Sequence, residues 1–301
     1  MQQLTGIQDL YLQLETGAMP MHASSLTIYD RTTAPGGSVD FAAIQRFIAE
    51  RASRLPFFRR RLVTIPLSLA RSYWIEDPGF DIEFHLRHIA LPKPGDWEQL
   101  CAQVARLHAR PLDRNRPLWE CYVIEELDNI PGLPRGSFAF FAKAHCAALG
   151  ETLSAQLFSA LHELAPDSRA SPPKVARYFD RKLTFVDLAT RTAADALKAP
   201  WSVARLLARQ AGPLLVSGAK EAAGLVTGRW GRGGHEAGGA VPTAPHIRFN
   251  GQVTPQRVTE GVRFDLHDVE RIRARVEGGT VNDVAIAVIA GALRRYLDAR
   301  F

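Results

Sequence analysis

The sequence has few cysteines and no long apolar segment. Its three cysteines, Cys101, Cys121 and Cys146, form no Cys-x-x-Cys pair and no other paired spacing. This usage is typical of the reducing cytoplasm rather than of a disulfide-stabilised secreted domain. The N-terminus lacks the basic and apolar regions of a signal peptide, and the longest apolar run near the end, residues 285–293, is too short to span a bilayer. We therefore expect a cytoplasmic protein, either soluble or peripheral at the inner membrane or at lipid inclusions.

The patterns of metal sites and nucleic-acid sites are missing as well. No set of His, Cys and acidic residues has the spacing of a metal site, and no basic motif is interleaved with aromatic residues. The formal charge is nevertheless +6, and much of the excess lies within residues 174–232, where Lys and Arg alternate with apolar residues. An anionic membrane surface or an acidic ligand suits this pattern, and a solvated basic face explains it equally well. We expect no bound metal and no nucleic-acid partner.

The sequence does contain enough apolar residues for a sizeable core. It is 301 residues long and 46% hydrophobic, which is sufficient for one large or two smaller domains. Residues spaced at helical or strand periodicity predict an α/β fold. Helices are expected over 5–15, 40–52, 96–109, 151–164, 268–276 and 282–297, and strands over 24–29, 62–65, 80–89, 118–125, 137–144 and 259–266. The last of these helices is apolar nearly all round, which is typical of a helix in the middle of a core.

Two changes in composition indicate the domain boundaries. Residues 166–174 are rich in Pro, Ser and Asp, and residues 228–239 are a Gly-rich segment typical of a linker. We therefore expect an α/β N-terminal domain over 1–165, a helical and Gly-rich crossover segment over 166–245, and the beginning of a second domain over 246–301.

Four blocks, in order along the chain, resemble one family of enzymes. They are Leu-Thr-Gly-Ile-Gln-Asp-Leu-Tyr-Leu-Gln-Leu-Glu-Thr at 4–16 with Met-Pro-Met-His at 19–22, Trp-Ile-Glu-Asp-Pro and Phe-His-Leu-Arg-His within 74–94, Arg-Pro-Leu-Asp-Arg and Arg-Pro-Leu-Trp-Glu within 110–120, and Arg-Phe-Asn-Gly at 248–251 with Thr-Val-Asn-Asp-Val at 280–284. The chain resembles the bacterial wax ester synthase/diacylglycerol acyltransferase family, a branch of the CoA-dependent acyltransferase superfamily. The resemblance implies a chloramphenicol acetyltransferase-like fold, with acyl-CoA as a substrate and a fatty alcohol or diacylglycerol as the acceptor. It implies no bound cofactor.

The family's catalytic pattern, H-H-x-x-x-D-G, is degenerate in this chain. Here it begins at His145 and Cys146, and Gly150 and Glu151 occupy its last two positions. In the family the second histidine is the general base that takes the proton of the acceptor alcohol, and the aspartate holds the turn that presents it. A cysteine thiol is a poor general base, because it titrates near pH 8.5 and burial raises that value. The resemblance therefore places the catalytic position at His145 and Cys146 and predicts impaired catalysis.

Each residue at this position has a second interpretation. Cys146 could instead be a small packing side chain, or a nucleophile that accepts an acyl group with His145 as its activator. A hydrogen-bonded structural role for His145 is the alternative to a catalytic one.

Other residues carry a family role beside a simpler structural one. Pro117, Leu118 and Trp119 are read as strand entry and packing, whereas the family role is the shaping of the substrate tunnel. Asn282 and Asp283 are read as caps of the last helix, whereas the family treats this pair as functionally important.

Three functions remain open. The first is an acyl-CoA-dependent O-acyltransferase that makes wax esters or triacylglycerol. The second is a non-catalytic pseudo-enzyme that binds acyl-CoA, lipid or a partner acyltransferase. The third is a truncated, N-terminal part that needs a separate C-terminal half or a homo-oligomer, because family members continue well past Phe301 and the apolar last helix has little of this chain left to cover it. An anionic membrane or a lipid droplet is a further expected partner.

Overall fold

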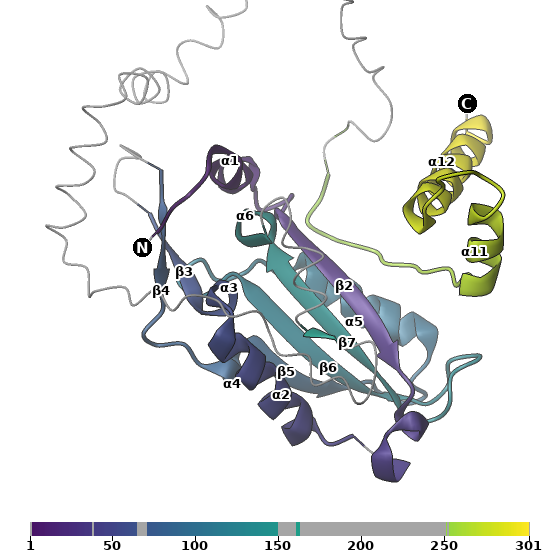
Figure 1. The fold of residues 1–301 in the computed structure, drawn as a ribbon, viewed down its shortest axis with the longest axis horizontal. Coiled ribbons are helices and arrows are strands. Elements are labelled where there is room, and N and C mark those ends of the chain that lie inside the picture. Colours follow the sequence, from purple (N-terminus) through teal and green to yellow (C-terminus); the bar gives the residue numbers. More distant parts are fainter. Residues whose placement is uncertain are drawn as a thin grey trace, which may run out of the picture. The chain divides into compact units, whose positions relative to one another are not determined.

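The computed structural model describes residues 2–37, 39–64, 71–149, 161–162, 251 and 253–300. It divides into two compact units, Met1–Val258 and Thr259–Phe301, which are described separately below (Figure 1). The predicted crossover segment and the domain boundaries at residues 165 and 245 lie outside the described residues, so they stay predictions.

A four-stranded mixed sheet is the framework of the first unit (Figure 1). Its order is β2 (His22–Tyr29), β7 (Ser137–His145), β6 (Trp119–Leu127) and β5 (Leu86–Ala90), with only β5 and β6 parallel. A smaller antiparallel sheet has the order β1 (Gln2–Gln3), β4 (Tyr73–Glu76) and β3 (Arg60–Val63). The predicted strands at 24–29, 62–65, 118–125 and 137–144 are confirmed within a few residues at their ends.

Three helices of this unit begin just after a residue whose side chain caps the helix. In α1 (Gly6–Leu14) the Thr5 side chain accepts from the Gln8 N–H and the Gln8 side chain accepts from the Thr5 N–H. Asp96 and Gln99 form the same reciprocal cap at α5 (Trp97–Ala109), and Asp40 caps α2 (Phe41–Arg54). Each cap satisfies backbone donors that have no partner inside the helix, which fixes where the helix starts. The predictions for 5–15, 40–52 and 96–109 are confirmed.

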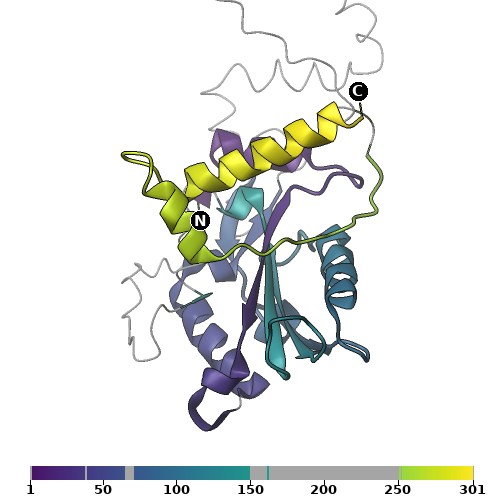
Figure 2. The same ribbon diagram turned by 90° about the vertical axis from the view of Figure 1, so that its right-hand side faces the viewer.

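The four-stranded sheet is covered on both faces, by α2 on one side and α5 on the other (Figure 2). Along β7 the side chains alternate: Phe138, Phe140, Ala142 and Ala144 belong to the apolar cluster on the α2 side. Ala139 and Phe141 belong to the cluster on the α5 side, with Leu100, Val104 and Leu107. Because successive strand residues point to opposite faces, a strand covered on both sides is apolar nearly throughout.

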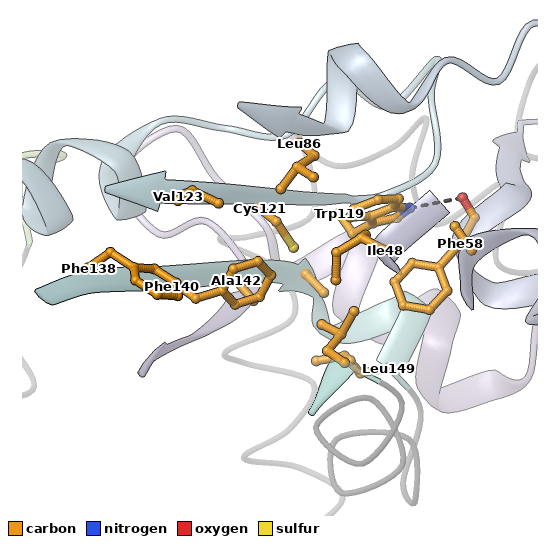
Figure 3. Close-up of a cluster of buried hydrophobic side chains, with 13 residues drawn as sticks. Ile48, Phe58, Leu86, Trp119, Cys121, Val123, Phe138, Phe140, Ala142 and Leu149 are labelled. Atoms are coloured by element: carbon orange, nitrogen blue, oxygen red, sulfur yellow. Dashed lines mark hydrogen bonds between the residues drawn. The ribbon is translucent and has the colours of Figure 1, made fainter. Parts of the chain in front are cut away.

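Trp119 lies at the centre of the α2-side cluster (Figure 3). Its indole Nε1–H donates to the Phe58 carbonyl at 2.9 Å, and its ring stacks on His85 with centroids 4.5 Å apart. Phe58 belongs to the short helix α3 (Pro56–Arg59), and His85 ends the short helix α4 (Ile82–His85). The predicted extended segment 80–89 is therefore wrong in its first half. There Asp81 caps a helical turn through the Glu83 N–H, and β5 begins only at Leu86.

The second unit contains two helices, α11 (Leu266–Arg273) and α12 (Val281–Asp298). The helix predicted at 282–297 is confirmed, and the helix predicted at 268–276 is confirmed with a start at Leu266. The strand predicted at 259–266 is wrong: these residues are irregular up to Asp265, which caps α11. A strand needs a neighbour for its backbone hydrogen bonds, and the described residues of this unit offer none.

Candidate functional site

The end of β7 is tied to the chain on both sides. His145, the last residue of β7, lies opposite His22 of β2, and its N–H donates to the Leu118 carbonyl at 3.0 Å. The next residue, Cys146, donates its N–H to the Met21 carbonyl at 2.8 Å and begins the one-turn helix α6 (Cys146–Leu149). Cys146 therefore follows the strand rather than belonging to it. The predicted helix at 151–164 lies outside the described residues except for residues 161–162, and the helical turn starts earlier than expected.

Both ring nitrogens of His145 face groups of the protein. Nδ1 accepts from the Ala147 N–H at 3.0 Å, so in the neutral ring the proton is on Nε2. Nε2 lies 3.5 Å from Glu15 Oε2 and has no hydrogen-bond partner among the described residues. The side chain is only 1% exposed, and this burial lowers its pKa although the Glu15 carboxylate opposes the shift. His145 is thus neutral at pH 7 with its one lone pair occupied, which is the geometry of a structural residue rather than of a base.

Glu15 is the carboxylate that connects this strand end to the rest of the unit. Oε2 accepts from Arg114 Nε at 3.0 Å and also contacts Arg114 Nη2. Burial raises the pKa of Glu15. The hydrogen bond from Arg114, the positive charge of Arg114 and the Met21 N–H outweigh this effect and bring the pKa of Glu15 below its usual range. Because His145 is neutral near pH 7, Arg114 supplies the positive charge that keeps Glu15 ionised.

The Cys146 side chain is half-buried at the start of α6, and its thiol is free. Burial raises the pKa of this thiol. At neutral pH the thiol is therefore protonated, so it is a weak nucleophile and holds no ready acceptor for an alcohol proton. Cys146 therefore presents a neutral S–H group at the start of α6.

A pair of histidines, His22 and His108, lies beside the strand end. His22 Nε2 donates to the His108 carbonyl at 2.5 Å, and the Ser24 hydroxyl lies 2.9 Å from His108 Nδ1. His22 is 7% exposed, and burial lowers its pKa to about 4, against the opposing effect of its bond to His108. Sequence patterns did not single out this pair, because its partners lie 86 residues apart.

The low pKa of His22 has a consequence for stability. Below pH 6.5 the unfolded chain binds a proton at His22 that the folded chain binds only near pH 4, so the folded state loses stability as the pH falls through this window. Between pH 7 and pH 4, the free energy of unfolding should fall by about 2–3 kcal/mol less in the His22→Gln variant than in the unaltered protein. Urea unfolding at both pH values measures this difference. The exposed His267 supplies the control: a His267→Gln variant should follow the unaltered protein, and parallel curves for all three proteins would contradict the assignment.

Lys143 is a buried charge on the α5 face of β7. Its Nζ donates to the Leu107 carbonyl at 2.9 Å and to the Arg110 carbonyl at 2.7 Å, and it lies 3.7 Å from Glu120 Oε2. Glu120 in turn accepts from the Tyr122 hydroxyl at 2.8 Å. Lys143 thus satisfies carbonyls at the C-terminal end of α5 and fixes the turn that leads to Arg114. Sequence analysis passed over this residue, although a lysine inside an apolar strand is itself a signal of a buried polar network.

Comparison with known proteins gives the family. The family described as the wax ester synthase/diacylglycerol acyltransferase catalytic domain matches residues 4–285. The chain belongs to this family. It is 31% identical to a putative diacylglycerol O-acyltransferase of Mycobacterium tuberculosis over 99% of this chain and 55% of that protein. It is 32% identical to the probable diacylglycerol O-acyltransferase tgs3 of the same organism, over 89% of this chain and 93% of that protein.

A solved structure of the family agrees with the fold. The wax ester synthase/diacylglycerol acyltransferase of Marinobacter aquaeolei VT8 matches with a TM-score of 0.60 and 25% identity, over 99% of this chain and 61% of that chain. The α/β fold of the CoA-dependent acyltransferase type is therefore confirmed. The chain spans about half the length of the first curated relatives it matches, whereas tgs3 is matched over most of its length.

The residues expected to shape the substrate tunnel lie in the core of the first unit. Pro117, Leu118 and Trp119 are all buried, and Leu118 packs with Leu4 and Trp74. Their packing role is directly visible, and a tunnel role stays a prediction. Gly150 and Glu151, the last two positions of the degenerate pattern, lie outside the described residues.

The expected capping pair at the start of α12 is only half right. The N-cap is Thr280, whose hydroxyl accepts from the Asp283 N–H at 3.2 Å, while Asp283 Oδ2 accepts from the Thr280 N–H at 2.8 Å. The Thr280 hydroxyl also donates to Asp283 Oδ2 at 2.6 Å, and the bonds from this hydroxyl and from the Thr280 N–H lower the pKa of Asp283. Asn282 lies inside the first turn with its side chain exposed. Thr280 was missed as the cap, although the spacing Thr-x-x-Asp indicates it.

The described residues contain neither a metal-binding cluster nor a membrane-spanning helix. No group of three or more His, Cys, Asp or Glu side chains among them could hold a metal ion. Within that same part of the chain, no helix has the length and apolar character needed to cross a bilayer.

Proposed function

We propose that this protein is an acyl-CoA-dependent O-acyltransferase that acylates a fatty alcohol or a diacylglycerol, with slow turnover. The observation that carries the proposal is the family match over residues 4–285, which includes the strand end at His145. The degenerate pattern at Cys146 supports the slow turnover. Acyl-CoA and the lipid alcohol are the proposed partners, and a cytoplasmic location, peripheral at an anionic membrane or lipid inclusion, suits such substrates.

The proposed reaction joins the acceptor oxygen to the acyl carbon and releases CoA. The alcohol oxygen attacks the thioester carbonyl, the C–S bond breaks, and the alcohol proton ends on the CoA sulfur. A general base that carries this proton contributes a factor of roughly 100 to 10,000. Cys146 is a protonated thiol and His145 has its lone pair bound to the Ala147 N–H, so neither residue supplies that base.

Product formation tests the proposal. Purified protein is incubated with a labelled long-chain acyl-CoA and either a fatty alcohol or a diacylglycerol, and wax ester or triacylglycerol is separated by chromatography. We expect ester that accumulates in proportion to protein concentration. Tight acyl-CoA binding with no ester above the buffer control would reject the enzyme and favour a non-catalytic lipid-binding protein.

One observation favours a second candidate, a chain that acts together with a C-terminal half or with another copy. The helix α12 carries large apolar side chains that are exposed within its own unit, among them Ile286, Ile289 and Leu293 at 64%, 59% and 45%. We propose that an acyltransferase-like half covers this helix. Sedimentation of the chain alone, and mixed with a C-terminal half taken from a longer relative, measures this. A stable monomer that does not bind the added half would contradict the second candidate.

A further inference from the structure

The carboxylate of Glu15 lies where three separate segments meet. Its Oε2 contacts Arg114 at 3.0 Å and lies 3.5 Å from His145 Nε2, and the Met21 N–H also donates to the carboxylate. Glu15 follows α1, Met21 precedes β2, His145 ends β7, and Arg114 lies between α5 and β6. In the ribbon α1 lies beside α6, the turn that His145 leads into (Figure 1). The Glu15 side chain is 13% exposed and the Arg114 side chain is 44% exposed, so the carboxylate is buried while water reaches the outer side of the guanidinium.

Arg114 holds this carboxylate in place. Besides its two contacts to Glu15, its Nη2 donates to the Leu12 carbonyl at 3.2 Å, in the last turn of α1. A guanidinium that bonds both a helix C-terminus and a carboxylate just after it makes a stiff connection, because its donors are fixed in one plane. The Glu15 side chain is therefore presented to His145 in one orientation.

The carboxylate in turn fixes the imidazole of His145. The N–H of Ala147, the second residue of α6, donates to Nδ1 and thereby sets the tautomer, with the proton on Nε2. The Glu15 carboxylate, 3.5 Å from Nε2, attracts this N–H and favours one orientation of the ring, as a carboxylate orients the histidine ligand in metal sites. The first turn of α6, which begins with Cys146, is thereby held in position.

We propose that Glu15, anchored by Arg114, is a positioning residue of this site: it holds the imidazole of His145 and, through it, the first turn of α6. The inference rests on the proposed function. It follows that a histidine introduced at Cys146 would stand on a turn whose position depends on Glu15. Glu15 acts through His145 and the α6 turn, without taking part in the chemistry.

Turnover of variants built on Cys146→His tests the first part. Adding Glu15→Gln to Cys146→His should lower kcat by roughly 10- to 100-fold, because a small displacement of a reacting group has effects of this size. Glu83→Gln, at an exposed acidic residue of α4, is the matched control and should leave kcat unchanged. An equal kcat in Cys146→His with and without Glu15→Gln would overturn the proposal.

Nitrogen NMR of the His145 ring tests positioning without any turnover, in the unaltered protein and in Glu15→Gln. The His145 signals are identified by their loss in His145→Gln. We expect the tautomer protonated on Nε2 in both proteins, because the Ala147 N–H still donates to Nδ1, and a further lowered pKa of His145 in Glu15→Gln. An unchanged pKa in Glu15→Gln would overturn the positioning role. Absence of ester from every Cys146→His variant would instead reject the proposed function and leave the NMR result to decide the role of Glu15.

Discussion

Replacing Cys146 by histidine is expected to raise kcat for ester formation by a factor of roughly 100 to 10,000, the usual contribution of a general base. An imidazole is neutral and basic at cellular pH, whereas burial keeps the present thiol protonated. The backbone at this position is already tied to the Met21 carbonyl, and the neighbouring His145 is held by Ala147 and Glu15. The measurement is initial velocity with a long-chain acyl-CoA and a fatty alcohol, at saturating concentrations of both.

Cys146→Ser is the matched control for this gain. A serine has a similar size and no basic nitrogen, so its rate should stay within a few fold of the unaltered protein. A fall of 100-fold in Cys146→Ser would mean that the thiol takes part in the reaction, as in the alternative where Cys146 accepts the acyl group. An equal rise in Cys146→His and Cys146→Ser would show that the gain comes from packing and not from proton transfer.

Replacing Lys143 by methionine is expected to lower the free energy of unfolding by about 3–5 kcal/mol, the usual effect of removing one partner of a buried ion pair. The Lys143 side chain is fully buried, and its loss leaves the Leu107 and Arg110 carbonyls without their donor and the Glu120 carboxylate without its positive partner. Burial lowers the pKa of Lys143, although Glu120 opposes the shift. Urea unfolding followed by circular dichroism at pH 7 measures the change.

Two further variants show whether the loss of stability comes from the unpaired Glu120 carboxylate. Adding Glu120→Gln to Lys143→Met removes the uncompensated carboxylate, so the double variant should be more stable than Lys143→Met alone. Lys93→Met, at an exposed lysine, should change the free energy of unfolding by less than about 0.5 kcal/mol. A loss below 1 kcal/mol in Lys143→Met would contradict the buried network.

Most of the first unit could be predicted from local patterns. Apolar periodicity and capping residues such as Thr5, Asp40 and Asp96 locate the helices, since a cap satisfies backbone groups within four residues of itself. The segment 259–266 shows where this approach fails. Its alternating pattern is that of a strand, but a strand also needs a partner, and partnership is not encoded in the segment itself.

The candidate site also contains residues that sequence patterns could predict and residues that they could not. The motif at His145 and Cys146 was predicted from the sequence, because family patterns are written in contiguous residues. Glu15 and Arg114 were not linked to it, because they are 99 residues apart and meet only through the packing of α1 against the strand end. Long-range ion pairs of this kind require the fold before they can be seen.

The rate of ester formation by the unaltered protein, compared in one assay with a relative that carries both histidines of the family pattern, tests the central claim most directly. The account predicts measurable ester at a rate roughly 100 to 10,000 times lower than that of the relative. Equal rates would contradict it, because they would show that a base other than an imidazole at position 146 accepts the alcohol proton.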